Sequence, residues 1–338
     1  MPFQSTLGKT VGKLIKSFRN QDMRTLKGVE VNRWEDTSVT STGGDQTLVP
    51  GNGYKYHTFT TSGSLVVAAV PGVHPGKAEL LMVAGGGSGG NGYFGGAGAG
   101  GVIHCDFPLQ ETTYPVTIGA GGVAPSSNGS DTTVASHPIG TLQALGGGYA
   151  GTYPTTAGAD GGSGGGEQDS GTGVGTGLQP TLNPNWTPQP NFNQYGNPGG
   201  AGNQTGAYQS AGGGGAGAAG QDPSPDYPGP YGHGGAGQPI PGFEYPIVGL
   251  APVDVDEEAN SPTSNHYGGG GGGWGYVVNP GGNAVVRAAG GGGSGRPGPA
   301  TGGPWSAPGT GTNALGGGGG SATTTGGSGS VIFRILIT

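Results

Sequence analysis

The sequence predicts an all-β protein, a small antiparallel β-sandwich with a polyglycine-II-like bundle of glycine-rich segments and a short N-terminal α-helix. Three observations support this fold class. Apolar runs of strand length concentrate in residues 54–145 and 331–338. Glycine contributes 85 of the 338 residues and proline 28. Only 9% of the residues are charged, yet 13 Tyr, 8 Phe and 4 Trp are spread along the chain, which disordered chains do not show.

Residues 1–25 predict an amphipathic α-helix with a docking function. Lysines follow one face, and five apolar residues share another at helical spacing: Leu7, Val11, Leu14, Ile15 and Phe18. Such a helix can lie on an anionic membrane or bury its apolar face against a protein partner. We favour the protein partner because only five apolar residues contribute. Residues 26–53 are polar and are expected to form an extended connector.

The strands are predicted from alternation and from short apolar runs. Residues 54–60 alternate, and with residues 65–70 they are expected to form a hairpin. The other predicted strands span residues 78–84, 101–107, 113–118, 131–135 and 139–145. The last eight residues, 331–338, are apolar enough for a central position in a sheet. The interior, residues 146–325, is predicted to be a glycine-rich insert region.

Glycine follows several apolar segments directly, without a polar turn. This happens before Gly85, Gly146, Gly290 and Gly316. Ordering glycine costs more conformational entropy than ordering any other residue, so an offsetting interaction is required. Backbone without side chains can form left-handed helices with three residues per turn, which can exchange N–H···O=C bonds with close neighbours. Flexible linkers are the alternative, but the aromatic residues among the glycines favour an ordered bundle.

Sites of catalysis or metal binding are not indicated. Two Gly-x-Ser-x-Gly matches, at residues 86–90 and 161–165, are expected by chance in a chain that is one-quarter glycine. We therefore expect no enzymatic activity and no cofactor. One acidic segment could offer oxygen ligands to Ca²⁺, although a solvated turn is the favoured interpretation: Asp254, Asp256, Glu257 and Glu258. The net charge of −7 argues against nucleic acid as a partner, and no stretch is long and apolar enough for membrane insertion.

Aromatic residues in Gly, Asn, Ser and Pro surroundings form the candidate receptor-binding set. Binding loops favour this composition because a ring offers contact area at little entropic cost. The set consists of Tyr93, Phe94, Tyr149, Tyr153, Trp186, Tyr195, Tyr208, Tyr227 and Tyr231. Rings together with Asn and Gln suit a carbohydrate or a loop of an outer-membrane protein. Alternatively, the rings pack against the glycine bundle.

The order of five blocks along the chain carries a family resemblance. The blocks span residues 56–67, 78–90, 96–103, 114–122 and 326–335. This order resembles the glycine-rich domain of bacteriophage tail-fibre and appendage virion proteins, over residues 54–338. The resemblance implies a polyglycine-II bundle, a place on the exterior of the phage particle, and a homo-oligomer, possibly a trimer.

The function expected on this basis is that of a virion structural protein with host attachment as its task. Its partners would be other tail or capsid proteins, bound through the N-terminal helix, and a host-surface glycan or outer-membrane protein. The alternative is a decoration or cement protein of the capsid or tail that has no host-binding role.

Overall fold

In this computed structural model the chain divides into two compact units, Met1–Thr37 and Ser38–Thr338. All described residues belong to the second unit. They are residues 39–70, 77–90, 95–136, 140–152, 157–168, 173–181, 183, 191–202, 210–223, 232–251, 265–274, 291–294 and 308–337. The expected N-terminal helix lies outside them, and so do its docking residues Leu7, Val11, Leu14, Ile15 and Phe18.

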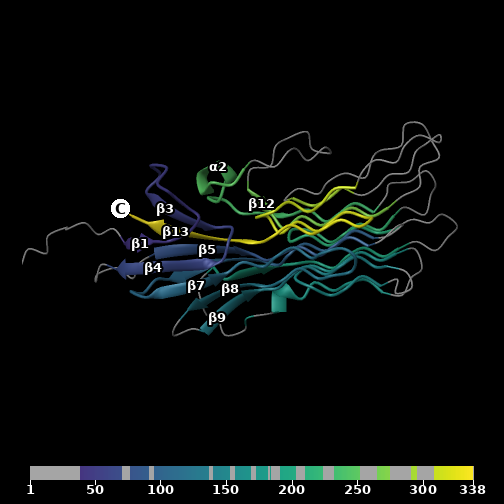
Figure 1. The fold of residues 1–338 in the computed structure, drawn as a ribbon, viewed down its shortest axis with the longest axis horizontal. Helices are drawn as coiled ribbons and strands as arrows, with labels where there is room; N and C mark the ends of the chain where they lie inside the picture. Colours follow the sequence, from purple (N-terminus) through teal and green to yellow (C-terminus); the bar gives the residue numbers. More distant parts are fainter. Residues whose placement is uncertain are drawn as a thin grey trace, which may run out of the picture. The chain divides into compact units, whose positions relative to one another are not determined.

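Two antiparallel sheets form the body of this unit (Figure 1). The five-stranded sheet has the order β1-β4-β7-β8-β9, with β1 (Thr40–Thr42), β4 (Gly63–Ala69), β7 (Thr113–Thr117), β8 (Thr132–Ser136) and β9 (Gly140–Ala144). The six-stranded sheet has the order β10-β6-β5-β13-β3-β2, with β10 (Asn193–Tyr195), β6 (Val102–Pro108), β5 (Lys77–Val83), β13 (Ser330–Leu336), β3 (Tyr54–Phe59) and β2 (Gln46–Leu48). The prediction of a mostly β chain with antiparallel sheets is confirmed.

The C-terminal strand β13 occupies the central position that its apolar sequence predicts. It pairs with β3 on one side and with β5 on the other. Val331 lies opposite both Phe59 and Met82, and all three side chains are buried. The C-terminal strand is therefore paired on both sides within the six-stranded sheet.

The predicted hairpin of residues 54–60 and 65–70 is wrong, because β3 and β4 belong to different sheets. The Asp45 carboxylate holds the connection between them. It accepts hydrogen bonds from the backbone N–H and hydroxyl groups of Thr60 and Thr61 at 2.6–2.9 Å. The chain thus crosses from one sheet to the other, and Phe59 and Leu65 both reach the core between the sheets.

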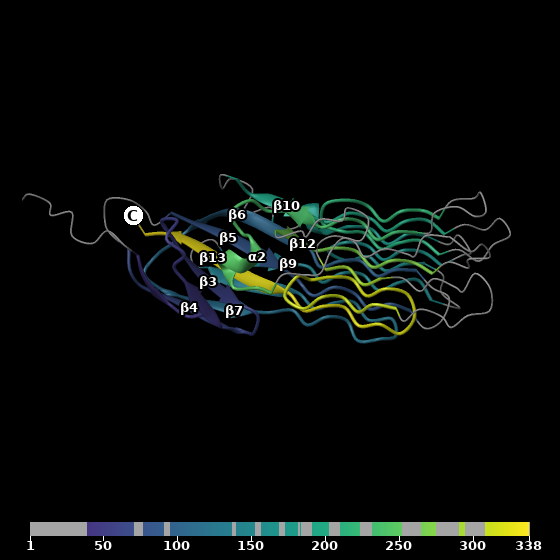
Figure 2. The ribbon, with the colours of Figure 1, turned by 90° about the horizontal axis from the view of Figure 1, so that it is seen from above.

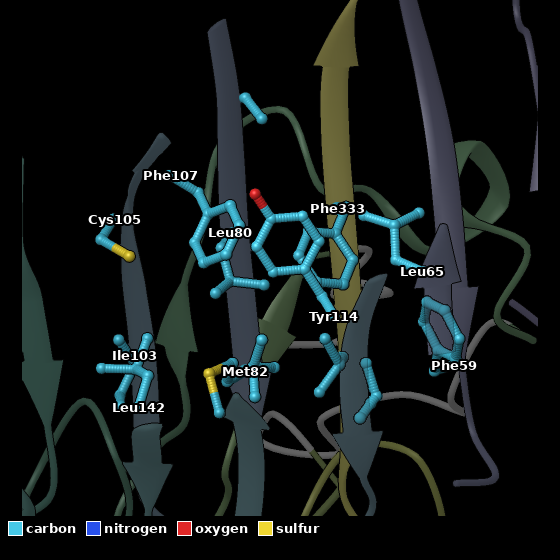
Figure 3. Packing of buried hydrophobic residues seen from close by; sticks show 14 of the residues in the cluster. Phe59, Leu65, Leu80, Met82, Ile103, Cys105, Phe107, Tyr114, Leu142 and Phe333 are labelled. Atoms are coloured by element: carbon cyan, nitrogen blue, oxygen red, sulfur yellow. The ribbon is translucent and has the colours of Figure 1, made fainter. Parts of the chain in front are cut away.

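A hydrophobic core lies between the two sheets (Figure 3). Phe107 from β6 meets Tyr114 from β7 edge to face, with ring centroids 5.2 Å apart, and it meets Phe333 at 5.4 Å. These rings link the two sheets directly. Cys105 is buried in the same core, and burial raises the pKa of its thiol to about 12. It is thus an inert apolar residue.

The outer face of the six-stranded sheet is covered by a second hydrophobic cluster. The cover comes from residues around α2 (Tyr245–Val248) and from Tyr267 in β12 (His266–Tyr267), which pairs with β11 (Gln238–Pro239). Phe243 meets Tyr56 of β3 edge to face at 6.5 Å. Burial raises the pKa of Tyr267 well above its usual range. Its hydroxyl donates to Phe243 O at 2.7 Å, so this buried polar group is satisfied.

Both lateral openings between the sheets are closed by the chain itself. On one side, β1 lies in the five-stranded sheet and β2 in the six-stranded sheet, although both fall in the expected connector of residues 26–53. On the other side, the side-chain amides of Gln179, Asn183 and Gln194 close the gap between β9 and β10. Gln179 begins the 3₁₀ helix η2 (Gln179–Thr181). Among the described residues, no helix has both the length and the apolar character needed to cross a bilayer.

Candidate functional site

The glycine-rich segments continue the sheets and run side by side (Figure 2). Residues 84–90 leave β5, and residues 95–101 return into β6. Within residues 84–89, N–H groups three positions apart donate to carbonyl oxygens of the same neighbouring segment, at 2.9–3.1 Å. The pairs are Ala84 to Gly101 and Gly87 to Gly98; Gly85 to Ser130 and Ser88 to Ser127; and Gly86 to Gly327 and Gly89 to Thr324. A period of three residues is that of the polyproline-II helix. The glycine segments are therefore ordered, with the repeat that backbone free of side chains permits.

The carbonyl groups of the same segment accept bonds from three further segments. The donors are the N–H groups of Gly147 and Ala150, of Gly122, and of Gly319. Residues 84–90 are consequently bonded to six neighbours, three through donors and three through acceptors. Residues 95–101 and 163–168 have the same arrangement. We call this array of hydrogen-bonded segments the glycine lattice.

Close approach of backbones explains why glycine fills the lattice. A Cβ atom added at Gly96 would lie 1.8 Å from the carbonyl oxygen of Gly271, and one at Gly213 would lie 2.0 Å from that of Ala97. Either contact would force neighbouring segments apart. The hydrogen bonds of the lattice thus offset the entropic cost of ordering glycine. An apolar strand such as β5 passes directly into glycine because the lattice begins where the sheet ends.

At the perimeter of the lattice, side-chain oxygens take the place of missing backbone acceptors. Several N–H groups bond a side chain where an interior residue would bond a carbonyl: Gly146 to Asp131 at 2.8 Å, Tyr149 to Asn128 at 3.0 Å, Thr176 to Asp160 at 2.6 Å, and Ala201 to Asp222 at 2.6 Å. A charged acceptor makes such a bond worth about 1.5–3 kcal/mol. Three of the chain's acidic residues, Asp131, Asp160 and Asp222, therefore cap the lattice.

The lattice has one end at the sheets and another that we call the distal end. The last described residues there are Gly90, Gly95, Thr152, Ala157, Gln168, Gly173, Gly202, Ser210, Pro223, Gly232, Trp274, Ser294 and Pro308. Hydrogen bonds such as Gly166 N to Gly96 O and Ser210 N to Trp274 O connect neighbouring segments near this end. The chain leaves and re-enters the described structure there six times, at the borders of residues 91–94, 153–156, 169–172, 203–209, 224–231 and 295–307. Residues 275–290 follow Trp274 at this end, but the next described residue, Gly291, pairs with Thr312 and lies against Leu315 of the second hydrophobic cluster, near the sheets.

Most of the predicted receptor-binding residues lie outside the described residues: Tyr93, Phe94, Tyr153, Trp186, Tyr208, Tyr227 and Tyr231. All of these except Trp186 belong to stretches that begin and end at the distal end. Tyr149 is half-buried in a lattice segment. Tyr195 is placed elsewhere, in β10, where it packs against the second hydrophobic cluster and burial raises its pKa. A further ring, Trp305, was missed, although its stretch also connects two distal-end residues, Ser294 and Pro308.

No metal or catalytic centre emerges from the described part of the chain. It contains no group of three or more His, Cys, Asp or Glu residues placed to bind a metal ion. The acidic segment with Asp254, Asp256, Glu257 and Glu258 lies outside it. Ser41 Oγ lies 2.8 Å from His57 Nε2, the spacing of a nucleophile and its base. Both residues are buried, however, and burial lowers the pKa of His57, so this pair joins β1 to β3.

Fold and site together define a class of protein, in which antiparallel sheets extend into a hydrogen-bonded glycine lattice with a loop-bearing end. The family model for a glycine-rich domain matches residues 59–336. The chain belongs to this glycine-rich domain family. A search of curated proteins and a search of solved structures returned no match.

Proposed function

We propose that this protein is a structural component of a bacteriophage appendage, such as a tail fibre, whose distal end attaches to the host surface. The observation that carries the proposal is that six chain stretches begin and end at the same end of the lattice. Their sequences hold seven aromatic residues but only three charged ones, Asp169, Asp226 and Arg296. The composition of these stretches is that of binding loops.

The lattice supports this proposal because it is a scaffold that fixes many loop ends at once. Binding residues are typically carried on loops that a rigid scaffold positions. Here the scaffold is backbone held by regular hydrogen bonds, so neighbouring segments approach closely and the described residues at their ends lie close together. Aromatic rings with Asn and Gln would then contact a glycan or a loop of an outer-membrane protein.

In this proposal the N-terminal part of the chain serves assembly. The basic, amphipathic residues 1–25 would dock onto other virion proteins, and the protein would lie on the exterior of the particle as a homo-oligomer such as a trimer. We further propose that the two sheets form a sandwich-type base from which the lattice extends.

One observation favours a second function, that of a decoration or cement protein. The described outward side chains of β1, β4, β7, β8 and β9 carry no charge: Thr40, Thr42, Ser64, Val66, Ala68, Thr113, Pro115, Thr117, Thr133, Ala135, Thr141 and Gln143. An uncharged sheet face can pack against another protein without the desolvation of charges. A cement protein would use this face and would have no need of the distal end.

Binding of the fluorescently labelled full-length protein to a panel of bacterial strains tests the two functions. We expect saturable binding to a subset of strains. The triple variant Tyr208→Ala/Tyr227→Ala/Tyr231→Ala should lose this binding, whereas the control Val49→Ala, at an exposed position outside the candidate set, should keep it. Binding to no strain, together with antibody labelling of the capsid surface, would support the cement function instead. Binding that survives the triple variant would contradict the role of the distal end.

A further inference from the structure

Glu167 is a buried carboxylate at the distal end of the lattice. Its residue is only 3% exposed, although it lies two positions before the undescribed stretch that starts at residue 169. A buried charge is costly unless hydrogen bonds satisfy it. No ion pair in the described part of the chain involves Glu167, so its hydrogen bonds to backbone N–H groups are what stabilise it.

Two hydrogen bonds from the Glu167 side chain reach two different segments. Oε1 accepts from Gly173 N at 2.8 Å, and Oε2 accepts from Gly202 N at 3.0 Å. The backbone of Glu167 adds two more bonds, from its N–H to Gly200 O and from Ala211 N to its carbonyl oxygen, both at 3.1 Å. Glu167 thereby contacts the chain just before and just after residues 203–209. It also contacts Gly173, the first described residue after 169–172.

The chemistry of the contact requires a carboxylate. Each oxygen accepts from a separate backbone donor, and neither donor bonds a backbone carbonyl of the described residues. A glutamine has one acceptor oxygen, and its NH₂ group would face the second N–H. An aspartate is one methylene shorter and cannot span both donors from the same backbone position.

We propose that Glu167 is a positioning residue for host recognition: its carboxylate fixes where the chain leaves and re-enters the lattice around residues 169–172 and 203–209. This inference rests on the proposed function. Tyr208, one of the candidate binding residues, lies in the second of these stretches. Glu167 contacts no receptor in this account; it acts through the segment ends that it holds.

The variant Glu167→Gln tests this role, with Asp131→Asn as the matched control. Asp131 also uses both carboxylate oxygens, accepting from Gly146 N at 2.8 Å and from Gln143 Nε2 at 2.6 Å, but it lies where the chain leaves β9. Both variants remove one carboxylate that caps the lattice. Only Glu167 lies at the distal end.

Amide exchange and cell binding are then measured on the full-length proteins, below the unfolding transition of each. Glu167→Gln should accelerate amide exchange at Gly173 or Gly202 about tenfold, because one charge-assisted hydrogen bond is lost. Exchange at Gly146 should be unchanged. It should also weaken binding to the strains that the wild type binds by about tenfold. Asp131→Asn should affect Gly146 alone and leave binding unchanged. If Glu167→Gln does not fold, Glu167→Asp takes its place.

Each contrary result has a separate meaning. Wild-type protection at both Gly173 and Gly202 in Glu167→Gln would overturn the bracing role of the carboxylate. Lost protection with unchanged cell binding would overturn the role in recognition. Equal loss of binding in Asp131→Asn would show a general effect of lattice stability and would also overturn it. If the wild type binds no strain, the proposed function fails, whereas exchange still decides whether Glu167 braces the segment ends.

Discussion

Gln179 accepts a hydrogen bond from the backbone N–H of Leu145 at 2.7 Å, at the point where β9 ends and a lattice segment begins. The Nε2 group of Gln179 donates to Gln143 O at 3.3 Å and to Gln194 Oε1 at 3.0 Å. Gln143 belongs to one sheet and Gln194 to the other. A single buried amide therefore joins the edges of both sheets and the start of the lattice, and it protects an otherwise open strand edge.

Replacement of this amide should destabilise the whole unit. Gln179→Ala leaves the buried N–H of Leu145 without an acceptor, which costs about 1–3 kcal/mol. We expect this loss in the free energy of unfolding, measured by chemical denaturation. The control is Gln110→Ala, since the side chain of Gln110 is exposed. Equal stability of the two variants would show that the edge contact contributes nothing.

A methyl group in the lattice should be more damaging than one in a strand. Gly96→Ala places Cβ 1.8 Å from Gly271 O, so two bonded segments must separate. We expect a loss of at least about 3 kcal/mol, the upper range for overpacking, or failure to fold. In Gly63→Ala the new Cβ meets the Phe59 ring at 3.4 Å, an ordinary contact. Thermal unfolding compares the two, and a tolerated Gly96→Ala would contradict close backbone packing at this position.

The ion cluster of Glu79, His104 and Arg334 should make the free energy of unfolding depend on pH in the acid range. The hydrogen bond with His104, together with the charge and hydrogen bond of Arg334, holds the pKa of Glu79 below its usual range. Since its folded-state pKa is lowered, ionised Glu79 stabilises the fold above the unfolded pKa of about 4.3, and this contribution disappears as the pH falls through the folded pKa.

The variant Glu79→Gln isolates that contribution. Its unfolding midpoint should lie below that of the wild type at pH 7, and the difference should shrink as the pH falls below about 4. Denaturation curves of both proteins across this range provide the measurement. A difference that stays constant down to acid pH would mean that Glu79 stabilises the fold through packing alone.

The main strands could be predicted because their apolar patterns are local. The alternation in Tyr54–Phe59 and the apolar run of Ser330–Leu336 are visible in the sequence, and the sheets follow them. The partner of a strand is a different matter. Residues 54–60 and 65–70 look like a hairpin, yet Asp45, distant in sequence, holds the connection that sends them into separate sheets. The short β1 has no apolar pattern, so it was missed.

The glycine lattice could be inferred from energetics, since ordered glycine needs hydrogen bonds to offset its entropy. Its capping residues could not. The partners of Glu167 are backbone N–H groups brought to it by the register of distant segments, and no side-chain motif records them. The position of Tyr195 could not be predicted either. Its Asn-Gln-Tyr-Gly surroundings are typical of a loop, but pairing with the distant Val102 places it in a sheet.

Amide exchange across the lattice tests the central claim most directly. Residues such as Gly98, Gly148 and Gly213 donate to carbonyls of neighbouring segments and are buried, although they belong to no strand or helix. If the lattice is a cooperative hydrogen-bonded layer, these amides should exchange as slowly as those of the central strand β13, through global unfolding. Exchange at the rate of an unprotected glycine chain, with β13 still protected, would contradict it.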